Sequence, residues 1–430
     1  MDVQAYLLSL EKLGIKFGLE NIRALCEAIG HPERAWPSAV VAGTNGKGSV
    51  SAMVEAGLRA AGRRTGLYTS PHLVRLEERF AIDGTPVATG DMEAAAATVR
   101  DAATTLRRTG RLATDPTFFE VTTALAFELF RRARVEFVVL EVGLGGRFDA
   151  TTAATPVAAA ITTIDFDHER FLGHTIAAIA SEKAGVIKHG MPVVVGETKA
   201  EAVAVIERAC AEQRATMIPA GAGVRAEVEA FEDGAGVVRL STPVRDYGVL
   251  RLALRGRHQV RNAVVAVRLL ETLDALGFGI PATAIAAAVT STRWRGRLDL
   301  LADAAGRAVL CDAAHNPAGA QSLATYLREV YPAGLPLVFG IMKDKDVGGT
   351  LGPLLPSVTH LVATAAHTDR AMAADRLADA ARHAGWRGSL DVEPEAGLAL
   401  DRAWERAPTI CAAGSIFLVG EVLARIPSDT

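Results

Sequence analysis

Several features are scarce in this chain of 430 residues, and each scarcity argues against a class of protein. Cysteine occurs only four times and at wide spacing, which argues against a disulfide framework or a metal site built from paired cysteines. The net charge is only −3 at pH 7, so nothing indicates a nucleic-acid or acidic-lipid partner. We expect all of the cysteines to be buried thiols of a reducing compartment: Cys26, Cys210, Cys311 and Cys411.

Targeting and membrane-spanning segments are not evident either. The first residues, Met1-Asp2-Val3-Gln4, lack the basic start and the apolar core of a signal peptide. No uninterrupted apolar run reaches the ~18 residues that a membrane helix needs, because charged residues, Thr or Gly interrupt the Ala-rich stretches. We therefore expect a cytoplasmic protein without a membrane partner.

What the chain does contain is a regular alternation of strand-like and helix-like segments. Continuous apolar runs predict buried strands, and helical spacing separates them. This pattern predicts an α/β protein whose mostly parallel sheets are covered by helices on both faces. The strands are expected at 65–67, 138–140, 158–161, 193–195, 309–311 and 337–339, and the clearest helices at 119–133 and 175–187.

Two places depart from the alternation, and the length favours two or three domains. Short alternating runs between about 219 and 256 predict a small antiparallel excursion. After Pro281 the helical pattern ends near Val289, and 292–297 indicates a connector. We expect a phosphate-loop-type domain over 1–292 and a smaller Rossmann-like α/β domain over 293–430.

The most informative segment is 40–49, VVAGTNGKGS. An apolar strand breaks into three glycines around Lys47 and then passes into helical spacing. Such a loop cradles phosphate with backbone N–H groups, a helix N-terminus and a lysine, and Ser49 could offer its hydroxyl to magnesium. It departs from the usual phosphate-loop pattern, because Val41 replaces the first glycine and Gly48 separates Lys47 from Ser49. A glycine-rich turn without a ligand is the alternative.

Polar residues follow other predicted strands, where α/β proteins place their sites. Ser70 and His72 follow the strand at 65–67, and Glu141 directly follows 138–140. Asp167 and His168 follow 158–161. An acidic group beside a phosphate loop suits magnesium, which must bridge protein and phosphate oxygens. Glu141 could instead be a helix cap or an ion-pair partner, and His168 a hydrogen-bonded loop histidine.

Four motifs, at 43–49, 69–72, 141–147 and 312–317, resemble the folylpolyglutamate synthase/dihydrofolate synthase family of the Mur ligase superfamily, whose members form amide bonds with ATP. Further matches lie at 167–173, 182–187, 256–263 and 414–421. The resemblance extends from about Leu13 to Gly420, with Ile416-Phe417 where Leu-Tyr is commoner. The resemblance implies that residues 43–49 have the form of phosphate loop that this superfamily uses, although they do not match the strict phosphate-loop pattern.

The activity implied by the resemblance is an ATP-dependent ligation. The γ-phosphate passes to a substrate carboxylate, and an amine attacks the acyl phosphate to give the amide. The substrates would be dihydropteroate or a reduced folate together with L-glutamate. We expect a bifunctional dihydrofolate and folylpolyglutamate synthase, with a monofunctional folylpolyglutamate synthase as the alternative. The family precedent favours a monomer.

The resemblance also implies roles for individual residues. ATP would contact Asn45, Gly46, Lys47, Gly48, Ser49, Asn262, Arg297 and Asp312. Two magnesium ions would be held by Ser49, Ser70, Glu141, His168 and Lys183. Lys183 matches a position that is carbamylated by carbon dioxide in many of these enzymes, which would turn a cation into a metal-binding carboxylate. Lys47, Lys183 and His315 are the expected catalytic residues.

Substrate-binding residues follow from the same resemblance. The pterin or folate would contact Thr117, Phe118, Phe119, Glu120, Phe148, Asp149 and Ala150, and the glutamate would lie near His315 and Ser415. Simpler interpretations exist for several of these residues. Lys183 could pair with Glu182, Arg297 could be a solvated linker arginine, and Phe119 could only begin an amphipathic helix. Asp312 and His315 could cap a helix or order a turn.

Three other classes of protein share part of these features. A Mur-type cell-wall ligase usually carries an extra N-terminal domain for its UDP-sugar, whereas only some 39 residues precede the phosphate loop here. A phosphate-loop NTPase acting as a switch or motor would not need a second α/β domain carrying 312–317. A nucleotide-binding protein without catalysis would not need the complete set of expected ligands.

Overall fold

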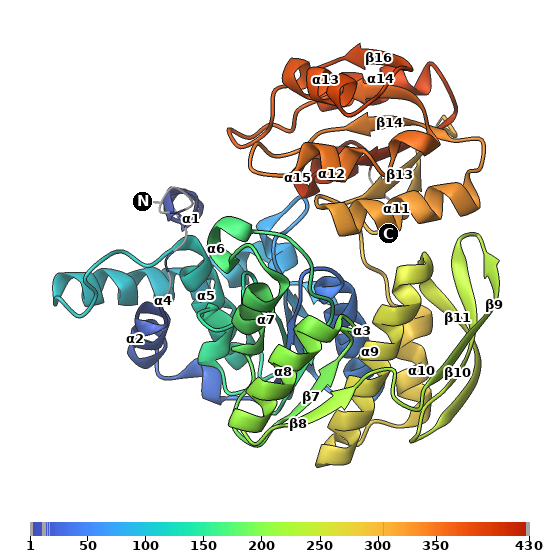
Figure 1. Cartoon of the computed structure of the whole chain (residues 1–430). Helices are drawn as coiled ribbons and strands as arrows, with labels where there is room; N and C mark the ends of the chain where they lie inside the picture. Colours follow the sequence, from blue (N-terminus) through green and yellow to red (C-terminus); the bar gives the residue numbers. More distant parts are fainter. Residues whose placement is uncertain (1–2, 11–13, 15, 17, 304, 427–430) are drawn as a thin grey trace.

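The computed structural model describes residues 3–10, 14, 16, 18–303 and 305–426. Met1, Asp2 and Leu13, which enter the predictions above, lie outside the described residues. The chain forms two α/β lobes (Figure 1). We call the elements from α1 to α10 the N-terminal lobe and those from β12 to α15 the C-terminal lobe.

The N-terminal lobe is built on a large sheet with the strand order β4-β3-β2-β5-β1-β6-β7-β8. The strands from β2 to β8 in this order are parallel, and β3 and β4 add an antiparallel edge. Its strands are β1 (Ser38–Ala42), β2 (Thr65–Tyr68), β3 (Phe80–Ile82), β4 (Thr85–Pro86), β5 (Phe137–Glu141), β6 (Ala158–Ile161), β7 (Pro192–Val195) and β8 (Thr216–Pro219).

Helices cover both faces of this sheet, which explains its continuous apolar strands. In β1, Val40 and Ala42 join one buried cluster, whereas Ala39 and Val41 join another on the opposite face. The helices are α1 (Val3–Leu10), α2 (Glu20–Ala28), α3 (Lys47–Ala60), α4 (Thr89–Arg108), α5 (Phe118–Arg132), α6 (Glu169–Leu172), α7 (Ile176–Ala184), α8 (Ala200–Glu212), α9 (Arg257–Leu273) and α10 (Ala282–Ser291). Short helical turns are η2 (Pro32–Arg34), η3 (Leu76–Arg79), η4 (Ala150–Ala153) and the π-type η5 (Asp274–Phe278).

A small antiparallel sheet stands beside α9 and α10, away from α4 (Figure 1). It consists of β9 (Arg225–Glu232), β10 (Ala235–Ser241) and β11 (Asp246–Arg255). Val238 and Leu252 on this sheet are buried in the same cluster as Leu269 of α9. The antiparallel excursion that the sequence predicts between about 219 and 256 is therefore confirmed.

The C-terminal lobe contains a second sheet, with the strand order β12-β13-β17-β14-β15-β16. All its neighbouring pairs are parallel except β12 with β13. The strands are β12 (Asp299–Ala302), β13 (Ala308–Asp312), β14 (Leu335–Phe339), β15 (Val358–Ala363), β16 (Ser389–Val392) and β17 (Thr409–Ala413). The helices are α11 (Pro317–Val330), α12 (Val347–Leu351), α13 (Ala374–His383), α14 (Ala396–Trp404) and α15 (Ile416–Arg425), with a short turn η6 (Leu355–Ser357). Buried clusters on both faces of this sheet confirm the predicted fold class.

Two local expectations differ from the structure. The helix expected at 175–187 ends at Ala184, and the chain continues in tighter turns, in which Val186 N donates to Lys183 O (3.3 Å) and Ile187 N to Ala184 O (3.0 Å). The expected strands also omitted all four edge strands of the two large sheets, β4, β8, β12 and β16, in each of which at least half of the residues are exposed. The domain boundary near 293 stays a prediction. Among the described residues, no helix is long and apolar enough to cross a membrane.

Candidate active site

The phosphate-loop candidate connects β1 to α3 at the carboxyl edge of the large sheet. Gly46 occupies the N-cap of α3 with φ 88°, a backbone conformation that favours glycine. Gly43 has φ 146°, and a Cβ added there would lie 1.9 Å from Thr162 Oγ1. These two glycines are therefore required by backbone conformation and, at Gly43, by a close approach.

The loop that follows β6 fixes the shape of the phosphate-loop candidate. Thr44 N donates to Thr163 O (2.6 Å), and Thr162 Oγ1 donates to Asn45 O (2.7 Å). The Lys47 ammonium turns back and donates to Thr44 O (3.1 Å). Neither Thr162 nor Thr163 was predicted as a site residue, although their place directly after a predicted strand is the signal that could have found them.

A chain of side-chain amides on α9 reaches the first turn of α3. Gln259 Nε2 donates to Ser49 Oγ (3.2 Å), and Asn262 Nδ2 donates to Gln259 Oε1 (2.9 Å). A Cβ added at Gly46 would meet Asn262 Oδ1 at 2.5 Å. The structure thus brings together three of the predicted ATP-binding residues, Gly46, Ser49 and Asn262.

The connector between the lobes lies against the same turn. A Cβ added at Gly48 would be 2.8 Å from Trp294 Nε1, so the indole ring covers that glycine. Arg297 follows within the connector, and its charge and that of Arg261 act on His258 of α9. Burial and then these two cations lower the pKa of His258 to about 4. Neither Trp294 nor His258 was predicted as a site residue.

Ser70 and Glu141 lie together because β2 and β5 are adjacent parallel strands. Ser70 N donates to Glu141 Oε2 (3.2 Å), while Ser70 Oγ is buried and has no partner among the described residues. Burial raises the pKa of Glu141, against the opposing charges of Lys47 and Arg297. A buried carboxylate beside an unpartnered hydroxyl suits a cation with oxygen ligands, so these residues fit the magnesium that the family implies.

Lys183, on α7, is buried under the phosphate-loop candidate. Its Nζ donates to Gly43 O (2.8 Å), and its alternative partner Glu182 pairs with Arg147 instead (3.3 Å). Burial and the charge of Lys47 lower the pKa of Lys183 to about 7. Because a carbamate forms on a neutral amine, this environment suits the predicted modification.

His168 is the N-cap of α6, with φ 50°. Burial lowers the pKa of its ring to about 4, and the nearby cations Lys345, His315 and Lys47 act in the same direction against Asp167. In the part of the chain that the structure describes, no group of three or more His, Cys, Asp and Glu residues could hold a metal ion. The predicted magnesium ligands include only two residues of these types, Glu141 and His168, so they would need serine and a modified lysine as well.

The lobes meet at Asp167, whose carboxylate is largely buried. Asn316 Nδ2 donates to Asp167 Oδ2 (3.0 Å), His315 Nε2 lies 3.4 Å from the same oxygen, and Lys345 Nζ pairs with Asp167 Oδ1. Burial alone would raise the pKa of Asp167, but the hydrogen bond and charge of His315, with His168 and Lys345, hold it well below the usual range. Lys345 was missed in the sequence, although it follows an expected strand.

Asp312, which was predicted to touch the nucleotide, holds the backbone directly after the connector. Its two carboxylate oxygens accept hydrogen bonds from Leu298 N and Ala314 N, both at 2.9 Å. His315 Nδ1 contacts Ala313 O (2.9 Å) within the same turn. Ser415 is buried at the N-cap of α15, where it accepts from Phe417 N (3.1 Å).

Several of the predicted pterin-binding residues are already engaged in the fold. Thr117 and Glu120 form a capping box at the start of α5, with Glu120 Oε2 accepting from Thr117 N (2.7 Å). The Phe119 ring lies against Tyr68, with 6.0 Å between the centroids, and an added Cβ at Gly143 would be 2.5 Å from it. The neighbouring Phe118 ring faces Arg79 at 5.1 Å.

Asp149 organises the loop after β5. Its Oδ2 accepts from Gly143 N and Leu144 N, both at 2.9 Å, and its Oδ1 accepts from the backbone N–H (3.1 Å) and the hydroxyl (2.5 Å) of Thr151. Ala150 is buried at the start of η4, whereas the preceding Phe148 is 44% exposed. Among these residues, Phe148 is therefore the most exposed.

Two family models match this chain. The Mur ligase middle domain matches residues 41–270, and the Mur ligase glutamate ligase domain matches residues 296–419. The dihydrofolate synthase/folylpolyglutamate synthase of Bacillus subtilis is 35% identical over 349 residues, covering 80% of each protein. A probable bifunctional folylpolyglutamate synthase/dihydropteroate synthase of Haloferax volcanii is 36% identical over 97% of this chain, but the chain spans only 49% of that protein.

Solved structures agree with the family models. The folylpolyglutamate synthase of Mycobacterium tuberculosis complexed with ADP superposes with a TM-score of 0.91 at 32% identity, covering 100% of both chains. Escherichia coli FolC in complex with DHPP and ADP gives a TM-score of 0.85 at 30% identity, covering 99% of this chain and 97% of that one.

Proposed function

Since this chain belongs to the Mur ligase family, with folylpolyglutamate and dihydrofolate synthases among its relatives, we propose that it is an ATP-dependent ligase that joins a pteroate or folate carboxylate to L-glutamate. The names of the relatives that it matches over most of their length support both acceptors, so we propose a bifunctional enzyme. A monofunctional folylpolyglutamate synthase would be the narrower outcome.

The observation that carries this proposal is the meeting of a phosphate-loop candidate and a second lobe at one site. Asn45 of the loop and Asn316 of the C-terminal lobe exchange hydrogen bonds of 3.3 and 3.1 Å. Beside them, His315 faces Asp167. A ligase must bring a nucleotide, an acid and an amine together, and a site shared between two lobes provides that proximity.

The phosphate-binding chemistry would fall to the loop before α3. Its backbone N–H groups, the N-terminus of α3 and the Lys47 ammonium would bind the ATP phosphates, and Arg297 would approach them from the connector. Ser49, Ser70 and Glu141 would hold one magnesium ion, and His168 and carbamylated Lys183 a second. When bound, magnesium neutralises charge on the phosphoryl group being transferred.

The second half of the reaction is the attack of the glutamate amine on the acyl phosphate. Both ring nitrogens of His315 are engaged, Nδ1 with Ala313 O (2.9 Å) and Nε2 with Asp167 Oδ2 (3.4 Å). These contacts would hold the ring beside the reacting groups, where it would orient the amine for attack. Contact between the lobes would exclude water from the hydrolysable acyl phosphate.

The experiment is phosphate release by the purified protein with Mg-ATP and L-glutamate, comparing dihydropteroate, tetrahydrofolate and no acceptor. We expect stimulation by both acceptors, with the amide products identified by mass. Stimulation by one acceptor would make the enzyme monofunctional. Release with neither would refute the folate assignment and direct attention to other carboxylates, including those of cell-wall ligases. The monomeric state and the cytoplasmic location stay predictions.

A further inference from the structure

Asp167 of the N-terminal lobe receives contacts from a set of groups on the C-terminal lobe. Lys345 Nζ pairs with Oδ1, while Asn316 Nδ2 (3.0 Å) and His315 Nε2 (3.4 Å) approach Oδ2. Asn316 also exchanges hydrogen bonds with Asn45 of the phosphate-loop candidate. We call Asn45, Asp167, His315, Asn316 and Lys345 the interlobe clasp.

Lys345 supplies the cation of the clasp from a loop that is itself held in place. It follows β14, and Lys345 N donates to Met342 O (3.2 Å) in a tight turn. The next residue, Asp346, caps α12 by accepting from Gly349 N (2.9 Å). The lysine is therefore presented on a fixed turn rather than on a free surface loop.

Burial makes this ion pair different from the surface pairs of the molecule. The Lys345 and Asp167 side chains are only 10% and 7% exposed. A buried pair contributes modestly when intact, but removing one partner leaves an uncompensated buried charge and is strongly destabilising. Without Lys345, closing the C-terminal lobe over Asp167 would bury an unpaired carboxylate. The closed arrangement of the two lobes would therefore be less stable.

We propose that Lys345 is a positioning residue, which pairs with Asp167 to hold the C-terminal lobe against the phosphate-loop lobe and so keeps His315 at the site. The effect of Lys345 on catalysis deepens the function proposed above and rests on it. Its effect on the arrangement of the lobes does not depend on that function. Lys345 acts through the clasp, since its Nζ donates to Asp167 and forms no other side-chain hydrogen bond or ion pair among the described residues.

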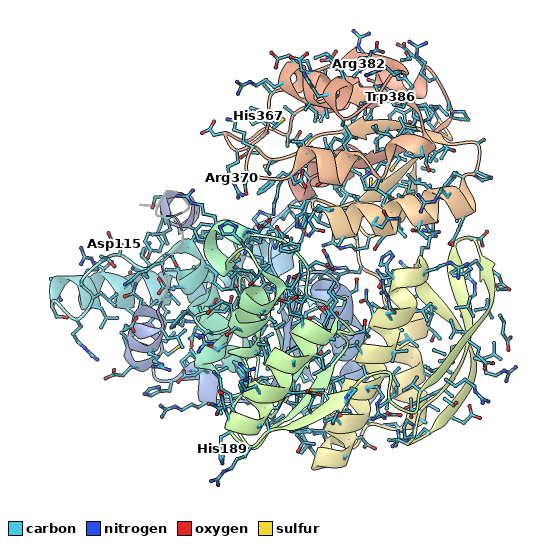
Figure 2. The ribbon with its side chains drawn as sticks, viewed as in Figure 1. Asp115, His189, His367, Arg370, Arg382 and Trp386 are labelled. Carbon is cyan, nitrogen blue, oxygen red and sulfur yellow. The ribbon has the colours of Figure 1, made fainter. Side chains whose placement is uncertain are left out.

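The first test measures the distance between spin labels on the two lobes of the ligand-free protein by double electron–electron resonance. His189 and Arg382 of α13 lie at opposite ends of the molecule (Figure 2), so spin labels at His189 and at Arg376 of the same helix, both exposed, report the lobe separation. The native cysteines are all buried, which limits unwanted labelling. We expect a narrow distance distribution for the wild type and a broader, longer one for Lys345→Met.

Two further variants control this test. Lys343→Met removes a lysine from the same loop whose Nζ donates to Asp369 O (2.7 Å) within the C-terminal lobe, and it should keep the wild-type distribution. Lys345→Arg retains the charge and should restore most of the narrow distribution. A wild-type distribution for Lys345→Met would overturn the proposal, and it would do so whether or not the protein proves to be a folate ligase.

The second test separates kcat from KM. Because ATP binds mainly to the N-terminal lobe in this scheme, Lys345→Met should lower kcat about 100-fold with a much smaller change in the KM for ATP. Adding Asp167→Asn should cause little further loss, since the pair is already broken. An unchanged kcat in Lys345→Met would refute the positioning role. Absence of ligase activity in the wild type would instead refute the proposed function, leaving the distance measurement as the test of the clasp.

Discussion

Replacing Asp149 with Asn should destabilise the N-terminal lobe rather than only weaken substrate binding. In the structure, both carboxylate oxygens of Asp149 accept hydrogen bonds, from Gly143 N, Leu144 N and the two donors of Thr151. An asparagine keeps one oxygen but turns the other into an NH2 donor that faces two donors. The substitution therefore removes two hydrogen bonds from a residue that is 4% exposed.

The magnitude follows from the strength of those bonds. Each hydrogen bond to a charged group contributes ~1.5–3 kcal/mol, so the loss of two should lower the free energy of unfolding by at least ~3 kcal/mol. At an unfolding entropy of ~2.1 cal/mol/K per residue, a lobe of this size should lose roughly 5 °C in melting temperature. The measurement is thermal unfolding by circular dichroism, together with the KM for dihydropteroate and tetrahydrofolate.

The adjacent Phe148 provides a matched control for this prediction. Its side chain is 44% exposed, so Phe148→Ala should cost much less stability than Asp149→Asn. If Phe148 lies beside the pterin, the same variant should raise the KM of the acceptor. A variant Asp149→Asn that melts like the wild type but shows a raised acceptor KM would refute the structural role and leave the carboxylate free to bind the pterin.

Four other outcomes are expected from the site. Lys47→Ala should reduce ATP turnover at least ~100-fold by removing a phosphate-binding cation; circular dichroism should show an intact fold, and wild-type turnover would refute the loop assignment. Glu141→Gln should raise the magnesium concentration needed for half-maximal activity, whereas an unchanged titration would exclude Glu141 as a ligand. Native mass spectrometry at saturating bicarbonate should detect one added carbon dioxide, absent in Lys183→Ala; its absence from the wild type would leave Lys183 cationic. Because the pKa of His258 is lowered to about 4, the unfolded chain binds more protons below pH 6.5, and stability should fall between pH 6.5 and 4. His258→Asn should remove up to ~3 kcal/mol of this loss, and identical pH profiles in urea unfolding would contradict the shift.

The strands and the phosphate-loop candidate were predictable because local sequence determines them. Continuous apolar runs identified β5, β6 and β7, since a strand buried on both faces needs no polar residue. The three glycines around Lys47 were equally visible, and two of them, Gly43 and Gly46, have positive φ. The edge strands β4, β8, β12 and β16 were missed because at least half of their residues are exposed, so burial does not require apolar residues along their whole length.

The partners within the site were not predictable, because contacts between distant segments leave no local pattern. Lys345 and Asp167 are 178 residues apart, and neither segment carries a local pattern that indicates the other as its partner. The residue type also does not reveal whether the oxygens of a carboxylate already accept hydrogen bonds within the fold. Asp149 and Glu120 look alike as candidate ligands, yet one organises a loop and the other completes a capping box.

The order in which the clasp residues occur along the chain has a consequence for synthesis on the ribosome. Asn45 is made 271 residues before Asn316, and domains generally fold as units from the N-terminus. A growing chain can therefore complete the large sheet and its phosphate-loop candidate before His315 and Lys345 exist. Under the proposed function, such an intermediate would offer a place for a nucleotide but no second lobe for ligation, so ATP would not be consumed in the reaction until the last third of the chain emerges.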